Sequence, residues 1–312
     1  MPTSFEAAGR RRLRPTPFVL SLLLLVLAAG CRGPHSGPQR RTLTVGDAQL
    51  YLERSGTGPA LVFLHGGQMD ARLWDDQVRR FAARYTVVRY DIRGYGRSSD
   101  VLGPYASHED LERVLNALDL ERVVLVGHSL GGRIAIDYAL DHPERVAGLV
   151  LVAPGVTGWD WSGPDHAFFE DILAAAEAGD SAGAVELWLA SPYMAPAMES
   201  PTLAARLRQL CRANERAWRM PDVERRREPP AVNQLEALTM PTLLVVGSRD
   251  VPDILRIADL LESTLPDVER VDLTGVGHVP NLEAAERFDR ELTEFLAERR
   301  GRNVSRPTTR DH

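Results

Sequence analysis

Short apolar runs alternate along the chain with longer stretches in which apolar residues recur every three or four positions. Runs of five to eight residues rich in Val, Leu and Ile predict strands, and the three- and four-residue spacing predicts amphipathic helices. The predicted strands are residues 42–46, 49–54, 60–64, 86–91, 122–127, 147–153, 242–247 and 269–273. The predicted helices are residues 71–84, 107–119, 130–141, 252–264 and 281–299. Strands that alternate with helices build parallel sheets, so the pattern predicts an α/β fold.

Residues 155–235 interrupt this alternation, because they predict helices without a strand. The segment carries most of the tryptophans of the chain, namely Trp159, Trp161, Trp188 and Trp218. We expect residues 41–154 and 236–298 to form the core, and residues 155–235 to form a helical cap over the site, since ligand pockets favour such boundaries. A helical subdomain without contact to a substrate is the alternative.

The first residues combine a basic segment, an apolar run and a cysteine. Arginines within residues 10–14 precede the run Pro17–Gly30, and Cys31 follows directly. The run has about 14 residues, fewer than the ~20 that a membrane-spanning helix needs. The order is typical of a signal peptide, and the ending "LAAGC" resembles a bacterial lipobox. We therefore expect residues 1–31 to be a lipoprotein-type signal peptide with its lipobox cysteine. Ordinary secretion, with Cys31 as a spare thiol, is the alternative.

Lipidation of Cys31 would attach the protein to a bacterial membrane, and to the outer membrane if the host has two. Residues 32–40 are rich in Pro, Gly and polar groups and predict a flexible tether. Residues 299–312 are polar and Arg-rich, and we expect a disordered tail there.

Composition narrows the class of protein. The 312 residues are 44% hydrophobic and 26% charged, which is typical of globular domains and not of disordered chains. The net charge of −6 is carried by arginine against Asp and Glu, because the chain contains no lysine. The arginine clusters at residues 10–14 and 225–227 are short and lack interleaved aromatic residues, so we expect no nucleic-acid partner. Oligomeric state cannot be predicted from these features.

The motif "GHSLGG" at residues 127–132 fits the pattern G-x-S-x-G. It follows a predicted buried strand and precedes a predicted helix, which places Ser129 on a sharp turn with its hydroxyl above the sheet. Glycines on either side permit such a turn because they have no Cβ to clash. The amino end of the helix also favours an oxyanion, so the motif predicts a nucleophilic serine.

A serine nucleophile needs a base, and the base needs an orienting acid. Asp250 follows the strand at 242–247, and His278 lies in a glycine-containing loop before the last helix. The order serine, aspartate, histidine predicts a catalytic triad. Asp253 and Asp160 compete with Asp250 for the role of the acid, and Asp250 could instead cap the following helix.

Backbone N–H groups next to the nucleophile are the expected oxyanion donors. We assign them to Leu130, directly after Ser129, and to Gly67 in the segment "FLHGGQ". His65 in this segment is expected to brace the loop by hydrogen bonds, and nothing marks His128 as catalytic. We interpret residues 91–99, "DIRGYGRSS", as scaffold around the site.

These motifs together resemble the α/β-hydrolase superfamily over residues 42–298, and "GRIAIDYALDHPERVAGLVLVAPG" is most similar to the branch of 3-oxoadipate enol-lactonases. The resemblance implies the α/β-hydrolase fold: an eight-stranded, mostly parallel sheet flanked by helices, with a cap after the sixth strand. It implies no cofactor and no metal. It also places Ser129, Asp250 and His278 at the nucleophile, acid and base positions.

The predicted activity is hydrolysis of a small-molecule carboxylic ester or lactone through an acyl-enzyme. A carbon–carbon bond hydrolase of the same fold is the alternative within enzymes. A binding protein that kept the fold and lost turnover is a third class, against which the complete triad argues.

Overall fold

The computed structural model describes residues 37–161 and 167–304, with side chains described as far as residue 298. The predicted signal peptide, Cys31 and the first part of the tether lie outside the described residues. Within the described ranges, no helix is long and apolar enough to cross a membrane.

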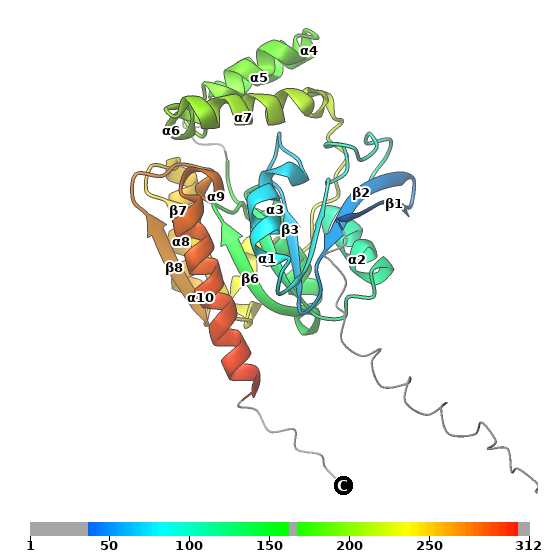
Figure 1. Ribbon diagram of the computed structural model, residues 1–312. Coiled ribbons are helices and arrows are strands. Elements are labelled where there is room, and N and C mark those ends of the chain that lie inside the picture. The colour runs from blue at the N-terminus through cyan, green and yellow to red at the C-terminus, as the bar shows by residue number, and fades with distance from the viewer. Residues whose placement is uncertain (1–36, 162–166, 305–312) are drawn as a thin grey trace, which may run out of the picture. The chain divides into compact units, whose positions relative to one another are not determined.

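One twisted sheet organises the described chain (Figure 1). Its strands are β1 (Gln39–Val45), β2 (Ala48–Ser55), β3 (Ala60–Leu64), β4 (Thr86–Tyr90), β5 (Val123–His128), β6 (Val146–Val152), β7 (Thr242–Gly247) and β8 (Val268–Leu273). They lie in the order β1-β2-β4-β3-β5-β6-β7-β8. β2 is antiparallel to β1 and β4, and the remaining pairs are parallel. The predicted eight-stranded, mostly parallel sheet is confirmed.

The central strands are apolar because helices cover them. Every residue of β3, β4, β5 and β7 is buried, whereas in each of the edge strands β1 and β8 only the last residue is buried. The helices of the core are α1 (Asp75–Phe81), α2 (Ser107–Ala117), α3 (Leu130–Asp141), α8 (Pro252–Thr264), α9 (Pro280–Glu283) and α10 (Ala285–Val304). α3 packs on β3, β5 and β6, which places the turn before it near the middle of the sheet.

The described parts of residues 155–235 form helices, with no strand among the named elements. The helices are α4 (Phe168–Glu177), α5 (Ser181–Leu189), α6 (Ala195–Met198) and α7 (Pro201–Ala213). Ser200 caps α7 through its hydroxyl and Pro201 occupies the first turn, a favourable helix start. Figure 1 shows α4 to α7 above the carboxyl ends of the parallel strands.

Several predicted boundaries were wrong by a few residues. β1 begins at Gln39, inside the predicted tether, because Gln39 and Arg40 pair with the end of β2 and Arg40 forms an ion pair with Glu53. α10 continues to Val304, so the predicted disorder from residue 299 is wrong for the first six residues of that segment. The predicted helix 71–84 is a 3-10 turn (η1, Ala71–Trp74) followed by α1.

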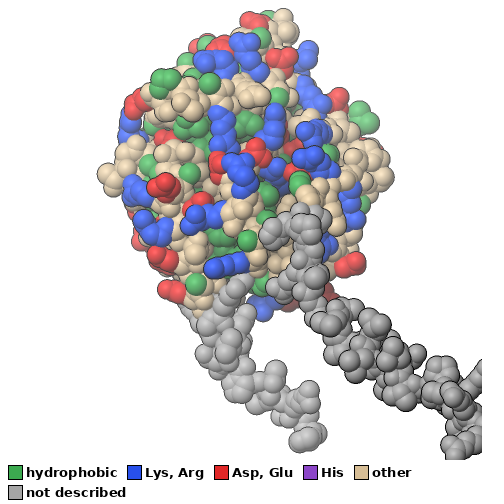
Figure 2. Space-filling view, viewed as in Figure 1, with side chains coloured by type: hydrophobic (Ala, Val, Ile, Leu, Met, Phe, Trp, Pro, Cys, Tyr) green, Lys and Arg blue, Asp and Glu red, His purple; other side chains and the backbone are tan. Residues whose placement is uncertain are grey.

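Surface arginines are largely paired with carboxylates. Arg270, for example, contacts Asp259, Glu262 and Asp272. Basic and acidic side chains are interspersed on the face shown in Figure 2.

Candidate active site

Ser129 sits on a strained turn between β5 and α3. Its φ of 50° and ψ of −109° lie where residues with a side chain are rarely found. The turn is held by backbone hydrogen bonds: Ser129 N donates to the Val152 carbonyl at 2.9 Å, and the Ser129 carbonyl accepts from Arg133 N and Gly155 N, both at 3.1 Å. The strain is therefore maintained by β6 and α3, and the serine is presented at the strand end.

The glycines of the motif are needed for close packing. A Cβ on Gly127 would lie 2.3 Å from the Gly131 carbonyl oxygen, and a Cβ on Gly131 would lie 2.4 Å from the Leu64 carbonyl oxygen. Both distances are far below van der Waals contact. The sequence "GHSLGG" thus folds this way because only glycine allows α3 to start so close to β3 and β5.

His278 and Asp250 lie side by side in the structure. His278 Nδ1 is 2.9 Å and 3.0 Å from the two carboxylate oxygens of Asp250. Both residues are buried, and Asp250 Oδ1 also accepts a hydrogen bond from Val251 N at 2.8 Å. A carboxylate at Nδ1 requires the proton on that nitrogen, so Nε2 of neutral His278 is left as a proton acceptor.

The competing carboxylates lie elsewhere. Asp253 Oδ1 accepts hydrogen bonds from Trp159 Nε1 at 3.1 Å and from Arg256 at 2.7 Å, at the start of α8. Asp160 is exposed. Of the three aspartates that the sequence proposes for the acid, Asp250 is the one bonded to His278.

Sequence reasoning missed two residues that hold the His278 loop. His128 Nε2 donates to the His278 carbonyl oxygen at 2.7 Å, and burial lowers the pKa of His128 to about 3, which keeps its ring neutral. The Glu283 carboxylate accepts from Gly277 N at 2.8 Å and from Val279 N at 3.0 Å, the two amides that flank His278. Glu283 belongs to the quoted motif "GVGHVPNLE", but its local pattern gives no sign of this contact.

The loop after β3 has the expected support. His65 Nδ1 donates to the Gly66 carbonyl at 2.8 Å, and its Nε2 accepts from Ile92 N at 2.9 Å, which confirms the predicted bracing. Burial lowers the pKa of His65, so the ring is neutral as these bonds require. Gly67 lines the same cavity as Ser129, and so does Leu130, whose N–H is in the first turn of α3 and has no helical acceptor.

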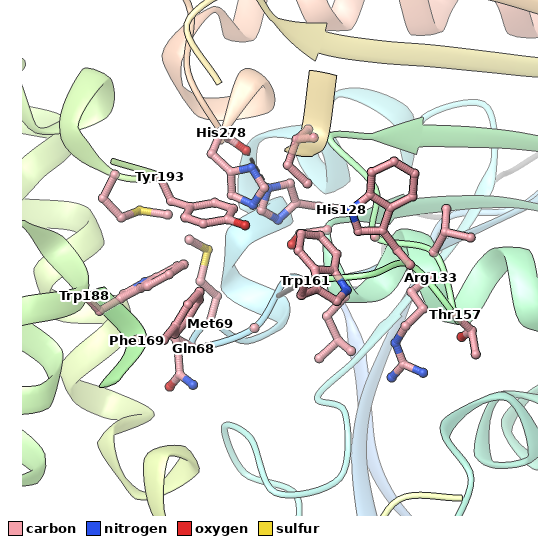
Figure 3. Close-up of a pocket in the computed structure, with 18 of the residues that line it drawn as sticks. Gln68, Met69, His128, Arg133, Thr157, Trp161, Phe169, Trp188, Tyr193 and His278 are labelled. Atoms are coloured by element: carbon pink, nitrogen blue, oxygen red, sulfur yellow. Dashed lines mark hydrogen bonds between the residues drawn. The ribbon is translucent and has the colours of Figure 1, made fainter. Parts of the chain in front are cut away.

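The cavity has a volume of about 710 Å³ and combines core and cap residues. Ser129 and His278 line it, and α4 and α5 contribute aromatic side chains. Figure 3 shows Trp188, Phe169 and Tyr193 on one side of His278, with Arg133 and Thr157 on the other. Tyr193 packs edge-on against the His278 ring, with centroids 4.7 Å apart, so the cap reaches the candidate base.

Ser129 and His278 are both at the cavity, but no hydrogen bond between their side chains is formed among the described residues. Such bonds are often long without a substrate and tighten in the reacting complex. The arrangement can therefore support nucleophilic attack by the serine, with proton transfer to Nε2.

Comparison with known proteins identifies the class. The sequence model of the alpha/beta hydrolase family matches residues 61–291, most of the chain. The chain therefore belongs to the alpha/beta hydrolase family and is a hydrolase.

Esterases are among the proteins that are similar to this chain. A pimeloyl-[acyl-carrier protein] methyl ester esterase from Nitrosomonas europaea is 30% identical over 77% of this chain and 97% of its own. A thermophilic esterase from Thermogutta terrifontis is 25% identical, with a TM-score of 0.71 over 84% of this chain and 99% of that chain. The enol-lactonase from Burkholderia xenovorans LB400 has a TM-score of 0.70 over 82% of this chain and 100% of that chain. Its identity of 20% shows the shared fold alone.

Proposed function

We propose that the chain hydrolyses carboxylic esters or lactones through an acyl-enzyme on Ser129. The observation that carries the proposal is the pairing of His278 Nδ1 with Asp250 at 2.9 Å, beside a strained serine at one cavity. A buried histidine oriented by a carboxylate is the base that a serine hydroxyl requires.

In the first half of the reaction, His278 Nε2 takes the proton of Ser129 Oγ as the oxygen attacks the substrate carbonyl carbon. The N–H groups of Gly67 and Leu130 stabilise the oxyanion that forms. His278 then gives the proton to the leaving alkoxide, the ester bond breaks, and the acyl group remains on Ser129. Water attacks this acyl-enzyme with His278 as base, which releases the acid and restores the serine hydroxyl.

Ester cleavage is supported by the methyl ester esterase at 30% identity, whose name states that activity. The apolar side chains of the cap supply a wall for a hydrocarbon part of the substrate, since the cavity includes Phe169 and Trp188.

The test is labelling with a fluorophosphonate probe, followed by mass spectrometry of the modified peptide. We expect Ser129 to be labelled and Ser129→Ala to be inert, both to the probe and on a p-nitrophenyl ester. Ser263→Ala, on the exposed side of α8, is the matched control and should behave as wild type. Wild-type protein that neither reacts with the probe nor cleaves the ester would instead be a binding protein with a hydrolase fold.

A further test shows whether Ser129 and His278 act as one catalytic unit or contribute to activity independently. Ser129→Ala and His278→Ala should each lower activity by about 10⁴ or more, and the double variant should lose little beyond either. Losses that add in the double variant would show that the two residues do not act together.

A further inference from the structure

One end of the cavity is lined by two arginines that the hydrolytic mechanism does not use. Arg133 and Arg226 both line it, together with Thr157. In Figure 3, Arg133 and Thr157 lie on the opposite side of His278 from Phe169, Trp188 and Tyr193, and Trp161 lies between His278 and Arg133. The cavity therefore has a basic end, and the candidate base lies between this end and the side chains of Phe169, Trp188 and Tyr193.

Arg133 is placed by the same helix that places the nucleophile. It lies four residues after Ser129, where its amide donates to the Ser129 carbonyl, so the rise between them along α3 is about 6 Å. Ser129 is the N-cap residue of α3, and Ser129 and Arg133 both line the cavity. The side chain of Arg133 is thus held one helical turn from the reacting hydroxyl, and it is 10% exposed.

The guanidinium of Arg133 has donors to spare. Its NH2 donates to both carboxylate oxygens of Glu224, at 2.8 Å and 2.9 Å, and its NH1 reaches Asp137 only at 3.5 Å. Within residues 37–161 and 167–298, no acceptor is recorded for its Nε. A guanidinium has five N–H donors, so the Nε–H group of Arg133 remains for a ligand.

Arg133 and Arg226 are paired with a common carboxylate. Arg226 bonds to the same carboxylate of Glu224, so two guanidinium groups share one glutamate. Asp137 is the other carboxyl beside Arg133, and burial raises its pKa, although the hydrogen bond from the Thr157 hydroxyl opposes that shift. A raised pKa means that Asp137 loses its charge at a higher pH than an ordinary aspartate does.

We propose that Arg133 and Arg226 form a subsite for a carboxylate of the substrate. This inference rests on the proposed function and narrows it: the preferred esters or lactones carry a carboxylate in the acyl or the alcohol part, a few bonds from the scissile bond. Planar guanidinium groups bind carboxylates with high geometric specificity, and the shared Glu224 holds both arginines in place.

A purely structural ion pair is the competing role. Glu224 also accepts a hydrogen bond from Ser107 Oγ at 2.6 Å, so the cluster ties α3 and α2 to the segment that returns from the cap. The two roles differ in what Glu224→Gln does. For a structural pair, the variant harms the hydrolysis of every substrate equally. For an anion subsite, it frees the arginines and strengthens the preference for a carboxylate.

The experiment uses two matched pairs of substrates. The acyl pair is mono-p-nitrophenyl adipate and the same compound with its free carboxylate converted to a methyl ester. The alcohol pair is 4-butyryloxybenzoate and the same compound with its benzoate carboxylate converted to a methyl ester. For each pair, kcat/KM of the carboxylate divided by kcat/KM of the methyl ester defines a preference ratio. Dividing the ratio of a variant by that of wild type removes the intrinsic reactivity of the esters.

We expect Arg133→Met to lower the preference ratio of one pair by about 10- to 100-fold, the size of a charge-assisted hydrogen bond. The pair that responds shows whether the carboxylate belongs to the acyl or the alcohol part. Arg226→Met should lower the ratio less, because its side chain is 48% exposed. Glu224→Gln should raise it.

Arg225→Met is the matched control, since Arg225 bonds to Glu109, is 60% exposed and does not line the cavity. Unchanged ratios in Arg133→Met and Arg226→Met would overturn the subsite. So would a Glu224→Gln variant that slows both members of each pair equally. If Arg133→Met does not fold, the preference ratios of Arg226→Met and Glu224→Gln still distinguish a carboxylate subsite from a structural ion pair.

Different results would refute the subsite proposal and the esterase proposal. Wild-type protein that cleaves the methyl esters but shows no arginine-dependent preference refutes the subsite and leaves the esterase proposal intact. Wild-type protein that cleaves none of the four esters and is not labelled at Ser129 refutes both.

Discussion

Replacing Asp250 with asparagine would change which ring nitrogen of His278 carries the proton, while barely changing the volume of the side chain at position 250. The carboxylate contacts His278 Nδ1 at 2.9 Å and 3.0 Å and accepts from Val251 N at 2.8 Å. An amide retains one oxygen, which can continue to bond to Val251 N. Its NH₂ group then faces Nδ1 and favours the tautomer with the proton on Nε2, which cannot accept a proton from the serine.

We expect kcat to fall about 10⁴-fold, because the same aspartate-to-asparagine change in a serine protease triad, which produces the wrong histidine tautomer, lowers kcat by about that factor. That loss corresponds to about 5.4 kcal/mol of activation free energy. Because the site is buried, the result should be the same in low and high salt. The assay is kcat on p-nitrophenyl butyrate, with the rate of fluorophosphonate labelling as a second readout and thermal unfolding to establish that the variant folds.

Asp253→Asn and Asp160→Asn are the matched controls, because both remove a carboxylate that the sequence alone proposed as the acid. Each should retain turnover within about tenfold of wild type, since neither side chain is bonded to His278. An Asp250→Asn variant with near-wild-type turnover, together with an inactive Asp160→Asn, would show that the acid has been assigned wrongly.

Three further outcomes are expected. Glu283→Gln should lower kcat by about 10- to 100-fold with little change in KM, because the carboxylate holds the two amides that flank His278; unchanged kcat would contradict this role. Gly131→Ala should cost about 2 kcal/mol or more, or about 4–8 °C in Tm, because its Cβ would overlap a β3 carbonyl, whereas Gly103→Ala, with room for a Cβ, should be nearly neutral. We propose from the sequence alone that Cys31 is lipidated, so Cys31→Ser should move the protein from the membrane to the soluble fraction; wild-type protein that is soluble with an unmodified N-terminus would refute the anchor.

Local sequence determined the elements of this fold and the turn that carries Ser129. Short segments rich in apolar residues predicted all eight strands. Burial on both faces of the sheet demands continuous apolar runs only in its central strands, such as β5 and β7. The turn at Ser129 could be predicted because the close approaches of Gly127 and Gly131 are local requirements of a strand that passes directly into a helix. Asp250 and His278 could be placed at strand ends, since the carboxyl ends of parallel strands gather at one edge.

Tertiary structure alone decided which distant groups meet. The bond from His128 to the His278 carbonyl joins residues 150 positions apart, and the pairing of Arg133 with Glu224 joins residues 91 positions apart. The same holds for β1, which begins earlier than its own apolar pattern indicates because pairing with β2 extends it. Periodicity reports which side of an element is buried, but not which partner lies opposite. That choice depends on how the sheet and the cap pack together, and it gives the cavity its aromatic and basic ends.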